Sequence, residues 1–465
     1  MSKLYILLGI KVIIMLYILL VSFNNYLFAE MLQDNTEEIF HKIVIELKEV
    51  QINKLQDLYI QLGLEDVTND SQSVFRRCYV SSLLPFKYLR EQLLNSRIVK
   101  EVEPDSLYRL NKIPDDPLFN MQWGLHNLGQ TKGKEDADVD APEAWDFHTG
   151  SREIVIAVID TGIDYNHIDL KDNIWINEGE IPKNGIDDDE NGYVDDVYGW
   201  DFFNWDNDPM DDSYPIYHGT HVSGIIGAIG DNSQGIAGMN WKIKIMPLKS
   251  FCKYGYAYLS NILPAIQYAI KMGANVINAS WGSIFPSEAL KEMIDYAGKN
   301  GVIFVAAAGN FRMDLDNPPK IRGRSIGFYP AGYDLPNIIS VAASDHNDKL
   351  AWFSNYGKTS VDLTAPGVNI ISTKFGNEYR YLSGTSMAAP HTTGVVGLML
   401  SQNLTINQRD IIETILDRVD PLPEFKEKVK SGGRLNAANC MGYFPRLSVP
   451  DYIMKFIYYY LVETN

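Results

Sequence analysis

The chain has 465 residues, of which 59 are Asp or Glu and 41 are Lys or Arg, so its formal net charge is −18. This length allows a large α/β domain with additions at one or both ends. The excess of acidic residues argues against nucleic-acid binding and against docking onto an anionic membrane surface.

Residues 1–29 have the features of a secretory signal. Two lysines accompany an apolar run at 12–23, and Ala29 is a small residue at a plausible cleavage point. The run is short for a membrane span of about 20 residues, although counting from residue 4 leaves an uncleaved anchor open. We therefore expect a secreted protein of the extracellular space or cell envelope.

The cysteine content agrees with export. Three cysteines fit an exported protein that does not rely on disulfides. Cys78 lies in a segment that we expect to be removed, and the sequence leaves open whether Cys252 and Cys440 pair.

A small α+β unit is predicted between the signal and the main domain. Strand patterns cover residues 42–47 and 98–105, and helical patterns cover 52–64 and 88–95. We place this unit at residues 30–112 and the main domain at 113–442.

The main domain alternates strand-like apolar runs with helical patterns, which predicts a doubly wound, mostly parallel sheet with helices on both faces. One buried strand runs from residue 154 and ends at Asp160, and another runs from 301 and ends at Gly309 and Asn310. Open α/β sheets place functional groups at the carboxyl ends of their strands. Asp160 is therefore a candidate functional residue, whereas Gly-Asn alone could be a plain turn.

Residues 218–227 read HGTHVSGIIG, a glycine-rich run that suits a tightly packed helix. His218 and His221 are three residues apart with no Glu between them, which is not the zinc-protease pattern. This favours catalysis over metal binding.

The insertion between residues 170 and 217 is strongly acidic. Asp187, Asp189, Asn191 and Asp195 fall at positions 1, 3, 5 and 9 of an EF-hand-like loop with a glycine at position 6. Tyr198 replaces the expected Glu at position 12, so a complete EF-hand is not expected. We predict a Ca²⁺ site here, and the alternative is a solvated acidic loop.

Ser386 lies in LSGTSMAAP at residues 382–390, a pattern typical of a tight turn that enters a helix. The free N–H groups and the dipole of a helix N-terminus favour an anion beside the hydroxyl. Taken alone, Gly-Thr-Ser is also ordinary capping chemistry.

Asp, His and Ser motifs in this chain order resemble those of the subtilisin-like serine proteases, the subtilases, over about residues 115–440. The resemblance implies a triad of Asp160, His221 and Ser386, in which His221 takes the proton of the Ser386 hydroxyl. His391 is a poor base candidate because five residues along one helix turn it about 140° away from Ser386.

The resemblance also implies the residues that hold the substrate. Asn310 would share the oxyanion with the backbone N–H of Ser386. The peptide would add as a β-strand along an edge, with its P1 side chain in a pocket, and Trp281 could equally be cover for the sheet. The implied substrate-binding residues are Ser280, Trp281, Gly282, Ala308 and Gly309.

A second calcium site and an inhibitory propeptide follow from the same resemblance. Asp116, Asp169 and Asn232 match side-chain ligands of thermitase-like members, with the carbonyls of residues 229, 234 and 236 completing the set. Ile168 replaces a proline that relatives usually carry before the Asp. Residues 30–112 resemble the propeptide that assists folding and then occupies the active-site cleft.

Residues 443–465 lie beyond the resemblance and are predicted only as a tail of unknown role, either an edge strand or an adhesive segment. We expect a secreted, calcium-stabilised serine endopeptidase that is made as a zymogen and cleaves proteins or peptides as a monomer. Two alternatives remain: a catalytically inactive binding protein on this scaffold, and a maturation protease with one dedicated substrate.

Overall fold

The computed structural model describes residues 41–47, 62, 65–66, 77–82, 86–96, 98–104, 112–321 and 324–442. Its contacts divide the chain into two compact units, Met1–Arg109 and Leu110–Asn465. The predicted signal, the predicted tail and all but Leu62 of the helix predicted at 52–64 lie outside the described residues.

The described part of the first unit is an antiparallel sheet with one helix. The strand order is β2-β3-β1-β4, with α3 following β3 in the chain. Ile45, Leu89, Leu93 and Val102 form a buried core between sheet and helix. The strands predicted at 42–47 and 98–105 and the helix predicted at 88–95 are confirmed. The elements are β1 His41–Leu47, β2 Glu65–Asp66, β3 Arg77–Ser82, α3 Phe86–Asn95 and β4 Val99–Pro104.

The second unit is built on a nine-stranded sheet with the order β16-β17-β13-β12-β9-β8-β5-β7-β6. Every described pairing in this sheet is parallel except that of β16 with β17. Its strands are apolar along nearly their whole length because helices cover both faces. They are β5 Val155–Asp160, β6 Trp200–Asp201, β7 Lys244–Lys249, β8 Val276–Ala279, β9 Ile303–Ala307, β12 Ile338–Ser344, β13 Leu363–Pro366, β16 Asp420–Pro421 and β17 Gly433–Arg434.

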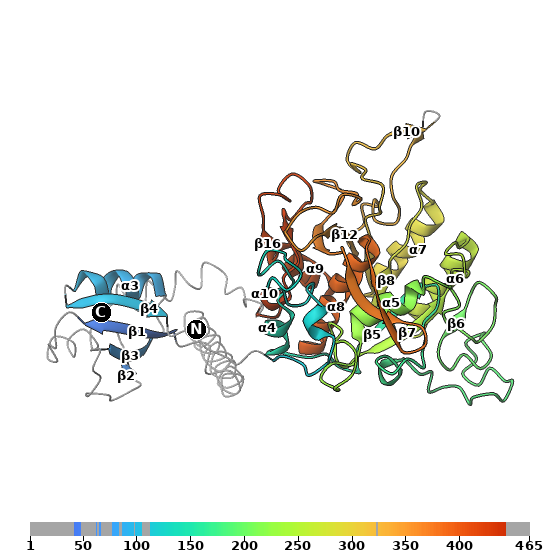
Figure 1. Ribbon diagram of the computed structural model, residues 1–465, viewed down its shortest axis with the longest axis horizontal. Helices are drawn as coiled ribbons and strands as arrows, with labels where there is room; N and C mark the ends of the chain where they lie inside the picture. Colours follow the sequence, from blue (N-terminus) through green and yellow to red (C-terminus); the bar gives the residue numbers. More distant parts are fainter. Residues whose placement is uncertain are drawn as a thin grey trace, which may run out of the picture. The chain divides into compact units, whose positions relative to one another are not determined.

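Two hydrophobic cores lie on opposite faces of this sheet. Helices α5 (His218–Gly227), α8 (Thr385–Gln402) and α9 (Gln408–Asp417) pack on one face, and α6 (Leu259–Lys271) and α7 (Glu288–Lys299) pack on the other. Figure 1 shows α8 beside the central strands that it contacts. The predicted doubly wound α/β fold is confirmed.

A hairpin of β14 (Ile370–Lys374) and β15 (Glu378–Leu382) packs against α5. The hydroxyls of Ser372 and Thr373 donate to the carbonyls of His221 and Thr220, at 2.7 Å each. A Cβ on Gly224 would lie 2.3 Å from both hydroxyl oxygens, so only glycine fits at this contact. The glycine-rich sequence of α5 therefore lets the hairpin lie directly on the helix. The remaining short elements are η1 Phe119–Met121, α4 Ala141–Trp145, η2 Lys171–Asn173, β10 Lys320–Ile321, β11 Arg324–Ser325 and α10 Ala437–Met441.

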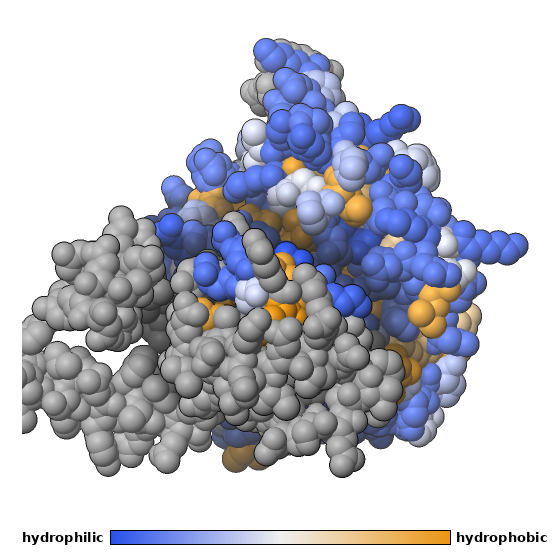
Figure 2. All heavy atoms as spheres, turned by 90° about the vertical axis from the view of Figure 1, so that its left-hand side faces the viewer, coloured by the Kyte–Doolittle hydropathy of each residue, from blue (hydrophilic) through white to orange (hydrophobic). Residues whose placement is uncertain are grey.

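Cys252 and Cys440 are both buried free thiols, which answers the open question of their pairing. Across the described ranges, no helix is long and apolar enough to cross a membrane. On the face shown in Figure 2, hydrophilic side chains predominate over the described surface and hydrophobic ones appear as small separate patches.

Candidate active site

Asp160 is the last residue of β5 and is 3% exposed. Its Oδ1 accepts the N–H of Thr161 at 2.7 Å, and its backbone carbonyl accepts the N–H groups of Ser250 and Phe251. The carboxylate is therefore fixed at the carboxyl end of the sheet, as predicted for a functional group in this fold.

His218 is the first residue of α5, and its Nδ1 lies 2.8 Å from Oδ1 and 3.0 Å from Oδ2 of Asp160. The next residue, Gly219, donates its N–H to the Thr161 hydroxyl at 2.9 Å. A Cβ on Gly219 would lie 2.1 Å from the Gly162 carbonyl oxygen, so glycine allows the helix start to approach the strand end. The close contacts of Gly219 with Thr161 and Gly162 thus place His218 beside Asp160.

The pKa of His218 is shifted by opposing effects. Burial disfavours the imidazolium, but the adjacent Asp160 carboxylate and its hydrogen bond outweigh burial, so the pKa lies above the ordinary value of 6.5. The arrangement stabilises a positive charge on His218.

His221 was predicted as the partner of Asp160, and the structure contradicts this. Its ring is fully buried, and its Nε2 lies 3.1 Å from the carbonyl oxygens of both Ile370 and Arg380. Three residues along α5 carry it about 4.5 Å deeper into the protein. Burial lowers its pKa to about 3. The first histidine of HGTH, not the second, meets Asp160, because only the first stands at the helix end beside the strand end.

Ser386 is the second residue of α8 and is half-buried. Its hydroxyl donates to the Ser280 carbonyl at 2.9 Å, and the Ser280 hydroxyl donates to the Ser386 carbonyl at 2.9 Å. Ser386 lines one cavity of about 400 Å³ together with Asp160, His218 and Asn310. His391 is buried on the same helix with its Nδ1 2.8 Å from the Met387 carbonyl, and it is not among the cavity's lining residues.

Asn310 follows β9 and turns its amide toward the start of α8. Its Oδ1 accepts the backbone N–H of Thr385 at 2.9 Å and the Thr385 hydroxyl at 3.0 Å. Since the oxygen serves these donors, the NH₂ group is the part of the amide that can serve a ligand. A Cβ on Gly384 would lie 3.3 Å from Asn310 Nδ2 and 3.6 Å from the Ser386 nitrogen. The Asn310 NH₂ group and the Ser386 N–H therefore lie close to the same space beside Ser386.

The predicted substrate residues divide between the cavity and the core. Ser280, Trp281 and Gly282 line the cavity, whereas Ala308 and Gly309 are not among its lining residues, and Ala308 is fully buried. Trp281 serves both predicted roles, because it lines the cavity and also donates its Nε1–H to the Ile159 carbonyl at 2.8 Å.

Sequence reasoning missed several other residues of the cavity wall. They come from four separate loops, so no local sequence pattern identifies them. They are Ser213, Ile216, Phe251, Lys253, Tyr254, Gly255, Phe311 and Phe328.

Two charged side chains behind the cavity were also missed. Asp211 is fully buried and accepts the N–H and the hydroxyl of Thr220, at 3.1 and 2.7 Å, which caps the start of α5. Lys249 is 2% exposed and donates to Asp212 and to the Thr161 carbonyl. Both hold the backbone that carries Asp160 and His218.

The structure brings Asp116, Asp169 and Asn232 together. Oδ1 of Asp169 accepts the Asn232 amide at 3.1 Å, and Oδ2 accepts the N–H of Ile236 at 3.0 Å. Asp116 is 5% exposed, and its Oδ1 has no hydrogen-bond partner among the described residues. Burial, with a smaller effect of Asp169, raises the pKa of Asp116 to about 6. A buried carboxylate oxygen without a donor, next to a second carboxylate, fits a cation.

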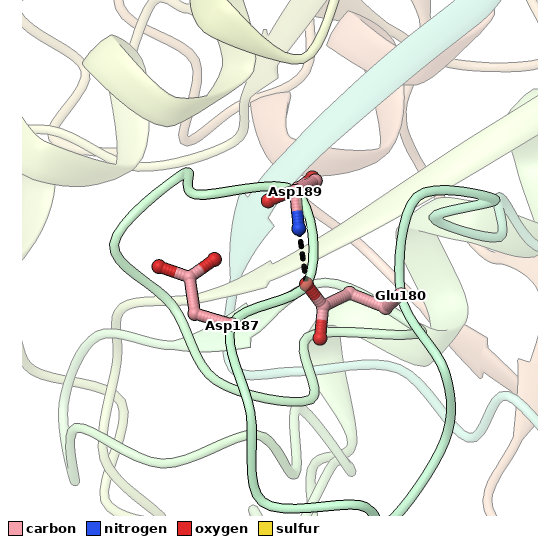
Figure 3. Close-up of side chains that lie close together, drawn as sticks. All are labelled: Glu180, Asp187 and Asp189. Atoms are coloured by element: carbon pink, nitrogen blue, oxygen red, sulfur yellow. Dashed lines mark hydrogen bonds between the residues drawn. The ribbon is translucent and has the colours of Figure 1, made fainter.

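The acidic loop holds a second carboxylate cluster, in which Glu180, Asp187 and Asp189 place oxygens within 4.8 Å of one another (Figure 3). Glu180 was not predicted, and it accepts the N–H groups of Asp189 and Asp195. Asp195 is not part of this cluster, and its carboxylate accepts the N–H groups of residues 184 and 185, so its role as a ligand stays a prediction.

Asn191 lies beside this cluster and takes part in the loop's own hydrogen bonds, and its role as a ligand stays a prediction. Its amide donates to Asp189 and Asp196, and its Oδ1 accepts the N–H of Tyr193. It braces the loop, whose carboxylate oxygens fit a hard cation such as Ca²⁺.

Comparison with known proteins identifies the family. The Subtilase family description matches residues 151–442. The thermophilic serine proteinase of Bacillus sp. (strain AK1) is 38% identical over 352 residues, covering 76% of this chain and 75% of the relative. Thermitase of Thermoactinomyces vulgaris is 35% identical, covering 71% and 99%. A solved protease structure from Pseudoalteromonas arctica is 28% identical with a TM-score of 0.55, covering 71% of this chain and 99% of that one. The chain belongs to the subtilases, a family of serine-type endopeptidases.

Proposed function

We propose that this protein hydrolyses peptide bonds through Ser386, with His218 as the general base and Asp160 as its partner. The observation that carries this proposal is the bond between Asp160 and His218 at a cavity that Ser386 and Asn310 also line. The triad is thus Asp160, His218 and Ser386, with the first histidine of HGTH in place of the second.

The chemistry follows from these positions. Neutral His218 takes the Ser386 proton on Nε2 as the hydroxyl oxygen attacks the scissile carbonyl. The resulting imidazolium is stabilised by Asp160, and the oxyanion accepts from Asn310 Nδ2 and the Ser386 N–H. His218 then gives its proton to the leaving amine, and a water molecule, deprotonated by His218, releases the acyl group from Ser386.

A fluorophosphonate probe with mass-spectrometric mapping tests this assignment. The reagent should modify Ser386 and abolish peptidase activity in proportion to labelling. Ser386→Ala should block labelling, whereas Ser383→Ala, three residues away and exposed, should not. Peptidase activity that survives complete labelling of Ser386 would refute the proposed nucleophile.

Residues 30–112 are proposed as an inhibitory propeptide. Two facts support this role: the α+β pattern resembles such units, and the contacts divide the chain after Arg109, close to the predicted boundary. If maturation is autocatalytic, Ser386→Ala should keep this segment, whereas the wild type should lose it near residues 108–116. A normally processed alanine variant, purified with no other protease present, would refute self-cleavage.

Calcium is proposed as a structural ion at two places. Asp116, Asp169 and Asn232 would hold one ion, and Glu180, Asp187 and Asp189 would hold another. Bound ions would offset repulsion between these carboxylates and hold together segments distant in sequence. We also propose that the protein is secreted, because residues 1–29 match a signal and one relative is named a halolysin-like extracellular serine protease, that of Natrialba magadii.

A further inference from the structure

The ring of Phe328 lines the active-site cavity and spans the gap between Gly282, which also lines the cavity, and Gly309, which does not. An ideal Cβ on Gly282 would lie 2.4 Å from Cε1 and 2.6 Å from Cζ of the ring, and one on Gly309 would lie 2.7 Å from Cγ and 2.8 Å from Cδ1. One end of the ring therefore touches each glycine. The side chain is only 8% exposed, so it fills this gap rather than standing beside it.

The two glycines lie next to the reacting groups. Gly309 immediately precedes Asn310, and Gly282 is two residues beyond Ser280, whose carbonyl accepts the Ser386 hydroxyl. A peptide with its scissile carbonyl on Ser386 and its oxygen toward Asn310 brings its acyl-side residue to the wall between these glycines. That residue then meets the Phe328 ring.

The ring is held from behind and cannot withdraw easily. The backbone of the next residue, Tyr329, exchanges two hydrogen bonds with Ser283, at 2.7 and 2.8 Å. Phe328 also belongs to a buried apolar cluster with Ala308, Ala342 and Phe425. Displacing the ring would open a close-packed core, which proteins resist. Phe311, 61% exposed with its ring centroid 5.8 Å from that of Phe328, lies toward the solvent side of the same wall.

We propose that Phe328 is a specificity-determining residue that restricts the acyl-side residue of the scissile bond to small side chains, namely Gly, Ala and Ser. This inference rests on the proposed function. Leucine and phenylalanine in that position would overlap the ring, and a peptide that carries them would bind the cavity without its carbonyl reaching Ser386. Peptides with such large acyl-side residues should therefore have a low kcat/KM.

Fluorogenic peptides that differ only in the acyl-side residue test the proposal. The wild type should cleave after Ala at least about 100-fold more efficiently than after Phe, since one methylene already discriminates about 10–200-fold in an apolar pocket. Phe328→Ala should reduce this ratio to less than about tenfold, through faster cleavage after Phe. Phe285→Ala, a 48% exposed aromatic that is not among the cavity's lining residues, should keep the wild-type ratio.

Phe328→Leu guards against a folding defect in the alanine variant. Leucine keeps an apolar core contact but shortens the side chain, so cleavage after Leu should improve relative to Ala by about tenfold. Rates are normalised to sites titrated with the fluorophosphonate. A wild type that cleaves after Phe as fast as after Ala, or folded variants with the wild-type ratio, would overturn the inference. Failure of the probe to label Ser386 would instead refute the proposed function itself.

Discussion

Nδ1 of His218 lies within hydrogen-bonding distance of both carboxylate oxygens of Asp160, at 2.8 and 3.0 Å. The carboxylate thereby fixes which ring nitrogen carries the proton and leaves Nε2 free to accept one. The buried Asp160 oxygen cannot exchange this partner for water, since the residue is 3% exposed.

Substituting the two histidines of α5 separately should give opposite phenotypes. His218→Ala should lower kcat at least about 10⁴-fold with little change in Tm, because the base is lost from a partly exposed position. His221→Ala should lower Tm, since it leaves a cavity and takes a hydrogen-bond partner from the buried carbonyl of Ile370 and the part-buried carbonyl of Arg380. Activity per titrated site should survive in the second variant. A His221 variant that folds normally but is inactive would instead support His221 as the general base.

The sequence predicts the strand ends of this site better than it predicts the helix start. The apolar runs before Asp160 and Asn310 identify buried strands, and their carboxyl ends meet at one edge of a parallel sheet. The choice between His218 and His221 depends on where the helix begins relative to β5. That is a tertiary relationship, made by Gly219 and Thr161, and helix boundaries are weakly encoded in local sequence.

The same limit applies to the cavity wall and to the acidic loop. Phe328 reaches the cavity through its pairing with the segment after Gly282, a contact between residues that are distant in sequence. Glu180 enters the carboxylate cluster from outside the EF-hand-like spacing, while Asp195 is turned toward a neighbouring backbone turn. Spacing therefore identified the loop as acidic and compact but did not determine which oxygens converge.

The pH dependence of catalysis should follow His218. Its pKa is raised above 6.5, and the base works only when neutral, so kcat/KM should rise with pH with a midpoint above 6.5. Asp160→Asn removes the charge that raises the pKa, so the midpoint should move to lower pH while kcat falls about 10⁴-fold. Peptide hydrolysis measured from pH 5 to 9 checks both shifts. An unchanged midpoint in the Asn variant would show that another group limits the rate.

Asn310 should act on kcat and not on binding. Asn310→Ala removes one donor to the oxyanion, which costs about 10²–10³-fold in kcat with KM nearly constant. It also removes the acceptor for Thr385, so Tm must be measured beside the kinetics. Asn310→Asp keeps that acceptor but supplies no NH₂ group, and it should show the same loss of kcat. A loss confined to KM would place Asn310 in substrate binding.

Chelation should weaken thermal survival far more than initial activity. An ion that binds only the folded state stabilises it by about 2.7 kcal/mol at a hundred times Kd. EDTA should therefore lower Tm and speed self-digestion, while activity at moderate temperature persists because the triad contains no metal ligand. Asp169→Asn and Glu180→Gln should each remove part of the Tm difference between calcium and EDTA. Equal melting curves in both solutions would refute both sites.

Asp140 should destabilise the folded protein at neutral and alkaline pH. Burial first, and then the carboxylates of Asp138 and Asp420, raise its pKa to about 8. A carboxyl with a raised folded pKa binds a proton in the folded state that the unfolded chain has released. The free energy of unfolding therefore falls as the pH rises from about 4 to about 8.

Asp140→Asn should remove this cost. The amide keeps an oxygen for the Asn436 NH₂ group, 2.6 Å away, and asparagine tolerates the left-handed backbone at φ 54°. Tm should rise by at least about 2–4 °C at pH 8 and by less at pH 5, as expected for about 1 kcal/mol in a large domain. Asp136→Asn is a graded control, because Asp136 shares the left-handed backbone at φ 66° but is exposed and contributes less to the raised pKa of Asp140 than Asp138 or Asp420 do, so its Tm gain at pH 8 should be the smaller one. Melting curves of the wild type and the two variants at both pH values test this prediction. A Tm gain that is equal at pH 5 and pH 8 would show that the Asp140 charge is not its cause.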